Sequence, residues 1–143
     1  MSNIARPSDR PRRKKRAEEA PESHVLELAA IGELMLGAAW SDGRRDAVEI
    51  VAIAEQLKEF VDMPELPSYV VARMEGFDPS SFSVEEAAGR LRFEDDGDRL
   101  GVLKLLARVA GADRHLHEGE LDYLKRFASA VGLDPDSIRV EIL

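Results

Sequence analysis

Hydrophobic side chains recur every three or four residues from Val25 onwards, with polar residues between them. This spacing places the apolar side chains on one face of an α-helix. A first helix is predicted to follow Pro21 and to end near Asp42-Gly43. Its many alanines and glycines would allow neighbouring helices to pack closely against it.

Local signals predict where the later helices begin and end. Asp46 with Glu49, and Ser83 with Glu86, have the spacing of a capping box, in which two residues satisfy the free N–H groups of a helix start. The first pair predicts a second helix, and the second pair predicts a helix that runs to about Phe93. Further helices are predicted over Tyr69–Glu75, which ends at Gly76, over 100–110, over 121–131, which ends at Gly132, and after Asp134-Pro135. The acidic run Glu94–Asp98 is predicted to be a solvated break between helices.

No segment shows the alternating pattern of a strand, so we predict an all-α fold, a compact bundle of about seven helices. The bundle also shows a weak internal repeat. The offset that superposes Asp42 on Asp113 also superposes Glu49 on Glu120. The same offset pairs Leu34 with Leu105, Ala39 with Ala110, Ile50 with Leu121, and Ile53 with Leu124. These matches indicate a duplicated helical hairpin with an acidic turn in each copy.

The charge is distributed unevenly. Residues 1–20 hold seven basic and three acidic residues, although the whole chain has a net charge of -8. We therefore predict a disordered basic arm over 1–21 and a helical domain over 22–143. The arm is either a solubilising tail without a partner or a tether that binds nucleic acid or an anionic surface through residues 6–16. The acidic domain itself is expected to repel nucleic acid.

Several classes of protein are disfavoured by what the sequence lacks. It contains no cysteine, no Gly-rich phosphate loop, no nucleophile motif and no HExxH sequence, so we expect no enzymatic activity. The longest apolar stretch, Leu34 to Trp40, is far shorter than the ~20 residues that span a bilayer. No secretory signal is recognisable after the basic N-terminus. The expected location is the cytoplasm.

The two acidic turns resemble those of a known family. The matching segments are Ala38-Ala39-Trp40-Ser41-Asp42-Gly43 with Glu49, and Ala110-Gly111-Ala112-Asp113 with Glu118 and Glu120. They are similar to the paired acidic turns of TerB-like (tellurite-resistance) domains, and the resemblance covers roughly residues 24–140. It implies an all-helical fold, a link to tellurite and other stress responses, and divalent metal binding by Asp42, Glu49, Asp113 and Glu120. The second turn departs from the family pattern, because Arg114 replaces a glycine and His117 replaces a small capping residue.

The acidic turns have two open interpretations. Carboxylate oxygens suit hard cations, and Ca²⁺ is the most suitable ion because it accepts irregular geometry with several oxygen ligands. Alternatively, the carboxylates are structural: Glu49 can close a capping box with Asp46, Glu120 can do so with His117, and both offset a helix dipole. Nearby His115 and His117 lack the spacing of a zinc motif and are expected to lie in a solvated turn.

These interpretations lead to two functional hypotheses. In the first, the chain is a non-enzymatic, TerB-like domain that binds a divalent cation at Asp42, Glu49, Asp113 and Glu120 and joins a protein assembly linked to stress response. In the alternative, it is a metal-free interaction adaptor or structural subunit that uses the bundle surface and the basic arm. Protein partners are expected under both hypotheses.

Overall fold

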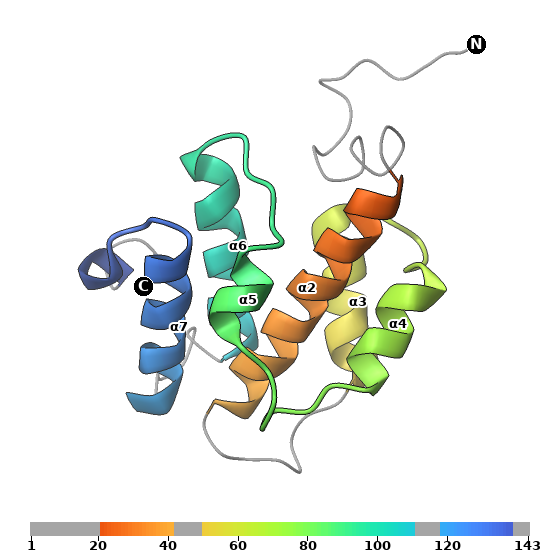
Figure 1. Cartoon of the computed structure of the whole chain (residues 1–143), viewed down its shortest axis with the longest axis horizontal. Coiled ribbons are helices and arrows are strands. Elements are labelled where there is room, and N and C mark those ends of the chain that lie inside the picture. Colours follow the sequence, from red (N-terminus) through yellow and green to blue (C-terminus); the bar gives the residue numbers. More distant parts are fainter. Residues whose placement is uncertain (1–20, 42–49, 111–117, 139–143) are drawn as a thin grey trace.

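The computed structural model of the chain describes residues 21–41, 50–110 and 118–138 (Figure 1). These residues form six α-helices and one turn of 3₁₀ helix, and none of them lies in a strand. The all-α prediction is therefore confirmed. In chain order the elements are α2 (Pro21–Trp40), α3 (Ile50–Val61), α4 (Ser68–Glu75), α5 (Val84–Ala88), α6 (Asp96–Val109), α7 (Glu118–Ala130) and the 3₁₀ helix η3 (Pro135–Ser137).

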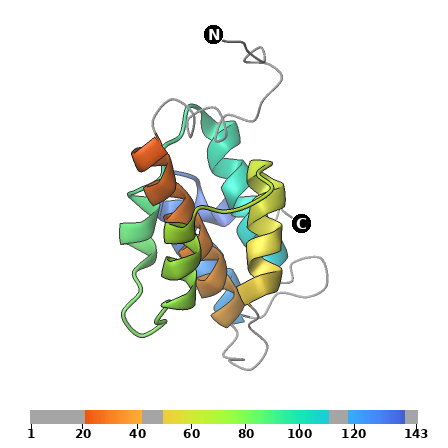
Figure 2. The same cartoon turned by 90° about the vertical axis from the view of Figure 1, so that its right-hand side faces the viewer.

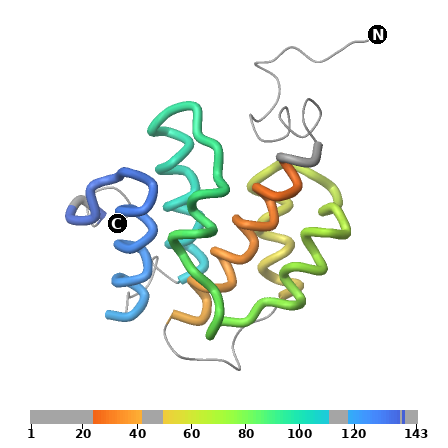
Figure 3. The backbone as a smooth tube through the Cα atoms, viewed as in Figure 1, coloured from red at the N-terminus to blue at the C-terminus, as the bar shows by residue number. Residues whose placement is uncertain are grey.

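Helix α2 is the centre of the bundle. It packs against α3, α4, α5, α6 and α7, and it lies between α3 and α4 on one side and α5, α6 and α7 on the other (Figures 1 and 3). A helix with neighbours on every side must be apolar almost all round, and α2 contains Leu28, Ile31, Leu34 and Met35, whose side chains are fully buried. The predicted first helix is confirmed, and it begins at Pro21.

Two glycines let neighbouring helices approach α2 closely. A Cβ atom at Gly32 would lie 2.9 Å from both Cγ and Sδ of Met74 in α4, and the two helices lie side by side in Figures 1 and 2. A Cβ atom at Gly37 would overlap the hydroxyl group of Tyr123 in α7. The small residues of α2 thus serve close helix packing, as the sequence predicts.

The two halves of the proposed repeat have the same organisation. Helices α2 and α3 pack together as one hairpin, and α6 and α7 pack together as another (Figure 3). Positions that the repeat superposes also have similar environments. Leu34 and Leu105 are both buried, Ile53 and Leu124 are both buried, and Ile50 and Leu121 are both half-buried.

Helix α5 is shorter than the sequence predicts. It begins at the predicted position, because Ser83 Oγ accepts a hydrogen bond from the backbone N–H of Glu86 at 3.2 Å. Among the described residues the Glu86 side chain does not return a bond, so only one half of the predicted capping box is formed. However, it ends at Ala88, and the prediction that it continues to Phe93 is wrong. Backbone N–H groups of Arg90 and Leu91 bond to carbonyls three residues earlier, which tightens and closes the last turn. The chain then leaves the helix and Leu91 is buried in the core.

The acidic run Glu94–Asp98 is only partly the predicted solvated break: Glu94 and Asp95 are exposed and lie outside the helices, but α6 begins at Asp96. Asp95 is the N-cap of α6, and its carboxylate accepts a bond from the backbone N–H of Asp98 at 3.0 Å. The Asp98 carboxylate in turn accepts a bond from the backbone N–H of Glu94 at 2.9 Å. This arrangement is similar to a capping box, except that Asp98 accepts from the residue before the N-cap and not from the N-cap residue itself. Asp96 pairs with Arg99 at 2.9 Å, so these carboxylates have structural roles.

The remaining boundary signals are confirmed where the structure describes them. Gly76 follows the end of α4, Gly132 has a positive φ of 85° after α7, and the Asp134 carboxylate caps η3. The predicted N-cap Asp46 and the basic arm over 1–20 lie outside the described residues. No helix in the described part of the chain is long and apolar enough to cross a bilayer.

Candidate metal centre at the paired inter-helix turns

Of the four predicted metal ligands, Glu120 is the one that the structure describes. Asp42, Glu49 and Asp113 lie outside the described residues, as do His115 and His117. The residues that border the two acidic turns are described, however. The first turn leaves α2 after Ser41, and the second turn enters α7 at Glu118.

The borders of the two turns contact each other. A Cβ atom built on Gly119, in the first turn of α7, would lie 2.5 Å from the backbone oxygen of Ser41. Only a residue without a side chain allows this approach. Ser41 itself is held at the end of α2, because its Oγ donates a hydrogen bond to the Ala38 carbonyl at 2.6 Å. Since Asp42 is bonded to Ser41 and Glu120 is bonded to Gly119, this contact joins the sequence neighbours of one predicted ligand from each hairpin.

Glu120 is a buried carboxylate, with 5% of its surface exposed. It lies in the first turn of α7, where a negative charge is stabilised by the positive end of the helix dipole. A buried carboxylate needs hydrogen bonds or a cation that compensate for the water it loses. Both interpretations made from the sequence, a helix-start carboxylate and a metal ligand, remain compatible with this position.

A hydrogen bond fixes α7 against α2 close to this carboxylate. Tyr123 lies one helical turn after Glu120, and its hydroxyl donates a bond of 2.7 Å to the Leu34 carbonyl. Burial of the ring raises the pKa of Tyr123 well above its ordinary value. The residue therefore orients the first turns of α7. Sequence reasoning missed it, because a tyrosine at an apolar position of a helix gives no sign of its distant acceptor.

The described residues alone do not complete a metal shell. Among them, no group of three or more histidine or carboxylate side chains lies close enough together to hold a metal ion. Glu118 is exposed in the same turn as Glu120, so two carboxylates come from α7. A complete oxygen shell therefore requires ligands from the acidic turns themselves, and an all-carboxylate donor set fits a hard cation such as Ca²⁺.

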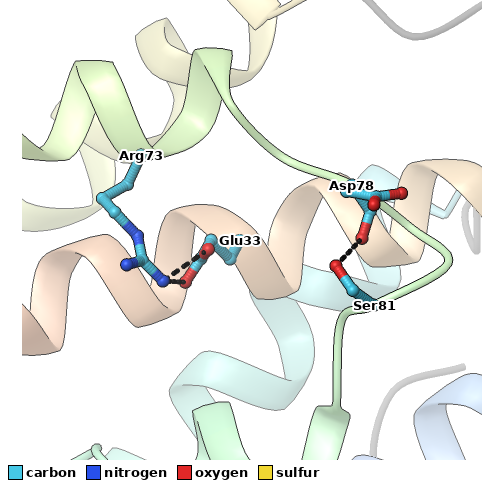
Figure 4. A network of polar contacts seen from close by, with 4 residues as sticks. All are labelled: Glu33, Arg73, Asp78 and Ser81. Atoms are coloured by element: carbon cyan, nitrogen blue, oxygen red, sulfur yellow. Dashed lines mark hydrogen bonds and ion pairs between the residues drawn. The ribbon is translucent and has the colours of Figure 1, made fainter.

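A second polar cluster, which the sequence did not reveal, lies between α2 and α4 (Figure 4). Nη2 of Arg73 donates to both carboxylate oxygens of Glu33, at 3.3 and 3.0 Å. Glu33 is 8% exposed, and its hydrogen bonds and charge raise the pKa of Arg73. The available signal was a glutamate within the apolar stretch of α2, because a buried carboxylate requires a partner.

Comparison with known proteins agrees with this architecture. The family described as tellurite resistance protein TerB matches residues 27–141, which include most of α2, all of the later helices and all four predicted ligand positions. No curated protein and no solved structure shows significant similarity to the chain. The family match covers most of the chain and agrees with its all-helical fold, and this chain belongs to the TerB family.

Proposed function

We propose that this chain is a non-enzymatic domain that binds a divalent cation, most suitably Ca²⁺, through Asp42, Glu49, Asp113 and Glu120. The observation that carries the proposal is the contact between Ser41 and Gly119, which brings the borders of the two acidic turns together. The buried carboxylate of Glu120 and membership of the TerB family support it.

The chemistry of Ca²⁺ explains why two turns are needed. This ion takes six to eight oxygen ligands, so the two carboxylates of one hairpin cannot complete its shell. Four carboxylates from both hairpins, together with backbone carbonyls and water, supply enough oxygen atoms. Several carboxylates held close together repel each other, and a cation removes this repulsion. Metal binding is therefore expected to stabilise the packing of α7 against α2.

A domain that acts by binding a metal ion suggests a wider role in the assembly of proteins. We infer that the chain works in the cytoplasm as part of a protein assembly linked to a tellurite-type stress response. Metal binding would stabilise one arrangement of the two hairpins, and a partner that prefers this arrangement would then bind more tightly. The acidic run at the start of α6 is not the proposed metal site, because its carboxylates cap the helix and pair with Arg99.

Thermal unfolding of the full chain tests the metal site. EDTA-stripped protein is titrated separately with Ca²⁺, Mg²⁺, Mn²⁺, Zn²⁺ and Ni²⁺. At a hundredfold excess over Kd, one bound ion should stabilise the fold by about 2.7 kcal/mol. For a domain of this size, that corresponds to a rise in Tm of roughly 10 °C.

Matched variants locate the ion. The double variant Asp42→Asn/Asp113→Asn and the single variant Glu120→Gln keep the shape of each side chain and remove its charge, so both should lose the ion-dependent rise in Tm. Asp122→Asn, at an exposed position of the same helix, should keep it. If no ion gives a selective rise at millimolar concentration, or if the rise persists in the double variant, the metal proposal is wrong and the carboxylates act as helix caps in a metal-free adaptor.

A further inference from the structure

A polar cavity lies between α2, α4 and α5. Its volume is about 360 Å³, which lies in the range of pockets that bind small molecules. Its walls come from segments far apart in the sequence. The residues that carry its chemistry are Glu33 of α2, Arg73 of α4, Phe77 and Phe82 of the connection between α4 and α5, Glu86 of α5, and Arg90 just after α5.

Some polar groups of this cavity are committed to holding its walls. Arg73 is bonded to the buried carboxylate of Glu33, so these two charges compensate each other (Figure 4). The Asp78 carboxylate accepts bonds from the backbone N–H and the hydroxyl group of Ser80, at 3.0 and 2.8 Å. These contacts fix the α4 wall and the turn that follows it, so they preorganise the cavity and are not available to a ligand.

Two opposite charges of the cavity are not committed. Glu86 and Arg90 are exposed, and neither side chain forms an ion pair or hydrogen bond in the described part of the structure. In a continuous helix, a glutamate and an arginine four residues later lie on the same face and can form an ion pair. Helix α5 ends at Ala88, however, so Arg90 leaves the helical surface on which Glu86 lies. The early helix end therefore leaves one carboxylate and one guanidinium group at the same cavity.

The connection between α4 and α5 adds an apolar wall. Phe77 and Phe82 are half-buried, and their ring centroids are 5.2 Å apart with an angle of 57° between the planes. This tilted arrangement is a favourable contact between aromatic rings. The pair offers an apolar surface beside the two uncommitted charges.

We propose that this cavity binds a small zwitterion, namely a free α-amino acid with an apolar side chain. Arg90 binds its carboxylate, Glu86 binds its ammonium group, and the aromatic pair contacts its side chain. A simple anion would be repelled by Glu86, since Arg73 is already neutralised by Glu33. A simple cation would be attracted by Glu86 and by Asp78 at the cavity edge, but it would leave the Arg90 guanidinium without a partner. A ligand that carries both charges satisfies both groups at once.

Isothermal titration calorimetry of the full chain with L-leucine and L-phenylalanine tests the proposal. Each amino acid is compared with its amide, which lacks the carboxylate, and with its N-acetyl derivative, which lacks the ammonium group. We expect saturable binding of the free amino acid, and binding about tenfold weaker for each blocked form, because each loses one charged hydrogen-bonding contact.

Variants assign each contact to a residue. Arg90→Gln should bind the amino acid about tenfold more weakly and no longer distinguish it from its amide. Glu86→Gln should weaken binding similarly and no longer distinguish the amino acid from its N-acetyl derivative. The matched control is Arg108→Gln, an exposed position of α6 that does not line this cavity, and it should bind normally. Circular dichroism confirms that each variant is folded.

Three results would overturn the proposal: no saturable binding of either amino acid, equal binding of the free and blocked forms, or binding unchanged in both Arg90→Gln and Glu86→Gln. All titrations are made in EDTA, so that their outcome does not depend on the metal site. Failure of the metal proposal would leave this one standing, and the reverse also holds.

Discussion

At the scale of single residues, a few polar side chains lie inside apolar surroundings and determine how α2 contacts its neighbours. The Glu27 carboxylate accepts a hydrogen bond from the backbone N–H of Arg92 at 2.9 Å, and Glu33 holds Arg73. The sequence identified Glu120 through the repeat and the family resemblance. It could not identify Glu33, because Arg73 is 40 residues away and no local pattern connects them.

Tyr123 provides a prediction at this scale. Tyr123→Phe removes the hydroxyl that donates to the Leu34 carbonyl and should lower the free energy of unfolding by about 1 kcal/mol. Urea denaturation at neutral pH measures this change. Tyr69→Phe is the control, because this residue is 42% exposed and water can replace the contact between its hydroxyl and Arg73. An equal loss in both variants would contradict the role given to the buried hydroxyl.

The same variant predicts an alkaline effect. Burial raises the pKa of Tyr123 in the folded state above the ordinary 10.0. As pH rises above that value, the unfolded chain ionises this tyrosine and the folded chain does not, so the wild type loses about 1.4 kcal/mol per pH unit. The stability advantage of the wild type over Tyr123→Phe should therefore shrink between about pH 9 and about pH 11. A constant difference would show that Tyr123 also ionises in the folded state.

At the scale of elements, the existence of helices was easier to predict than their ends. The spacing of apolar residues determines a helix over many residues, so the described helices agree with the sequence. An end depends on a few local bonds. At the start of α6, Asp95 and Asp98 bond to backbone N–H groups that a loop would leave to water. At Ala88, local backbone bonds end α5 where a longer helix was possible. Neither set of bonds can be recognised from the spacing of apolar residues.

Two helical glycines give opposite predictions. Gly37→Ala should destabilise the protein by about 1–3 kcal/mol, because the added methyl group meets the Tyr123 ring and hydroxyl and forces α7 away from α2. Gly101→Ala in α6 should instead stabilise it by about 0.5–1 kcal/mol, since a Cβ atom there meets nothing within 4 Å and alanine favours the helix. Urea denaturation compares the two. Stabilisation by both would contradict close packing at Gly37.

At the scale of the whole molecule, α2 of the first hairpin is the central helix against which the second hairpin packs, and the family match begins within α2. Residues 27–141 match the TerB family, whereas the basic run lies before them. The division into an arm over 1–21 and a domain over 22–143 remains a prediction from composition. According to this division, the helices alone unfold cooperatively and the arm does not contribute to the stability of the domain.

Removal of residues 1–20 tests this division. The shortened chain should keep the far-UV circular dichroism spectrum of helices and the Tm of the full chain, because the arm has few apolar side chains to bury. Any salt-dependent binding of nucleic acid by the full chain should disappear, since the acidic domain repels phosphate groups. A clear fall in Tm would show that the arm packs on the domain.

The sequence by itself determined the all-helical class and the order of the helices, because these features depend on local spacing that can be read along the chain. It also indicated a duplicated hairpin, and the family resemblance implied the candidate ligands. Tertiary structure decided which distant residues meet: Ser41 with Gly119, Glu33 with Arg73, and Tyr123 with Leu34. It also placed Glu86 and Arg90 at one cavity without pairing them. Such contacts depend on how helices pack around α2, and the cost or gain of burying each polar group becomes defined only when its partner from another helix is in place.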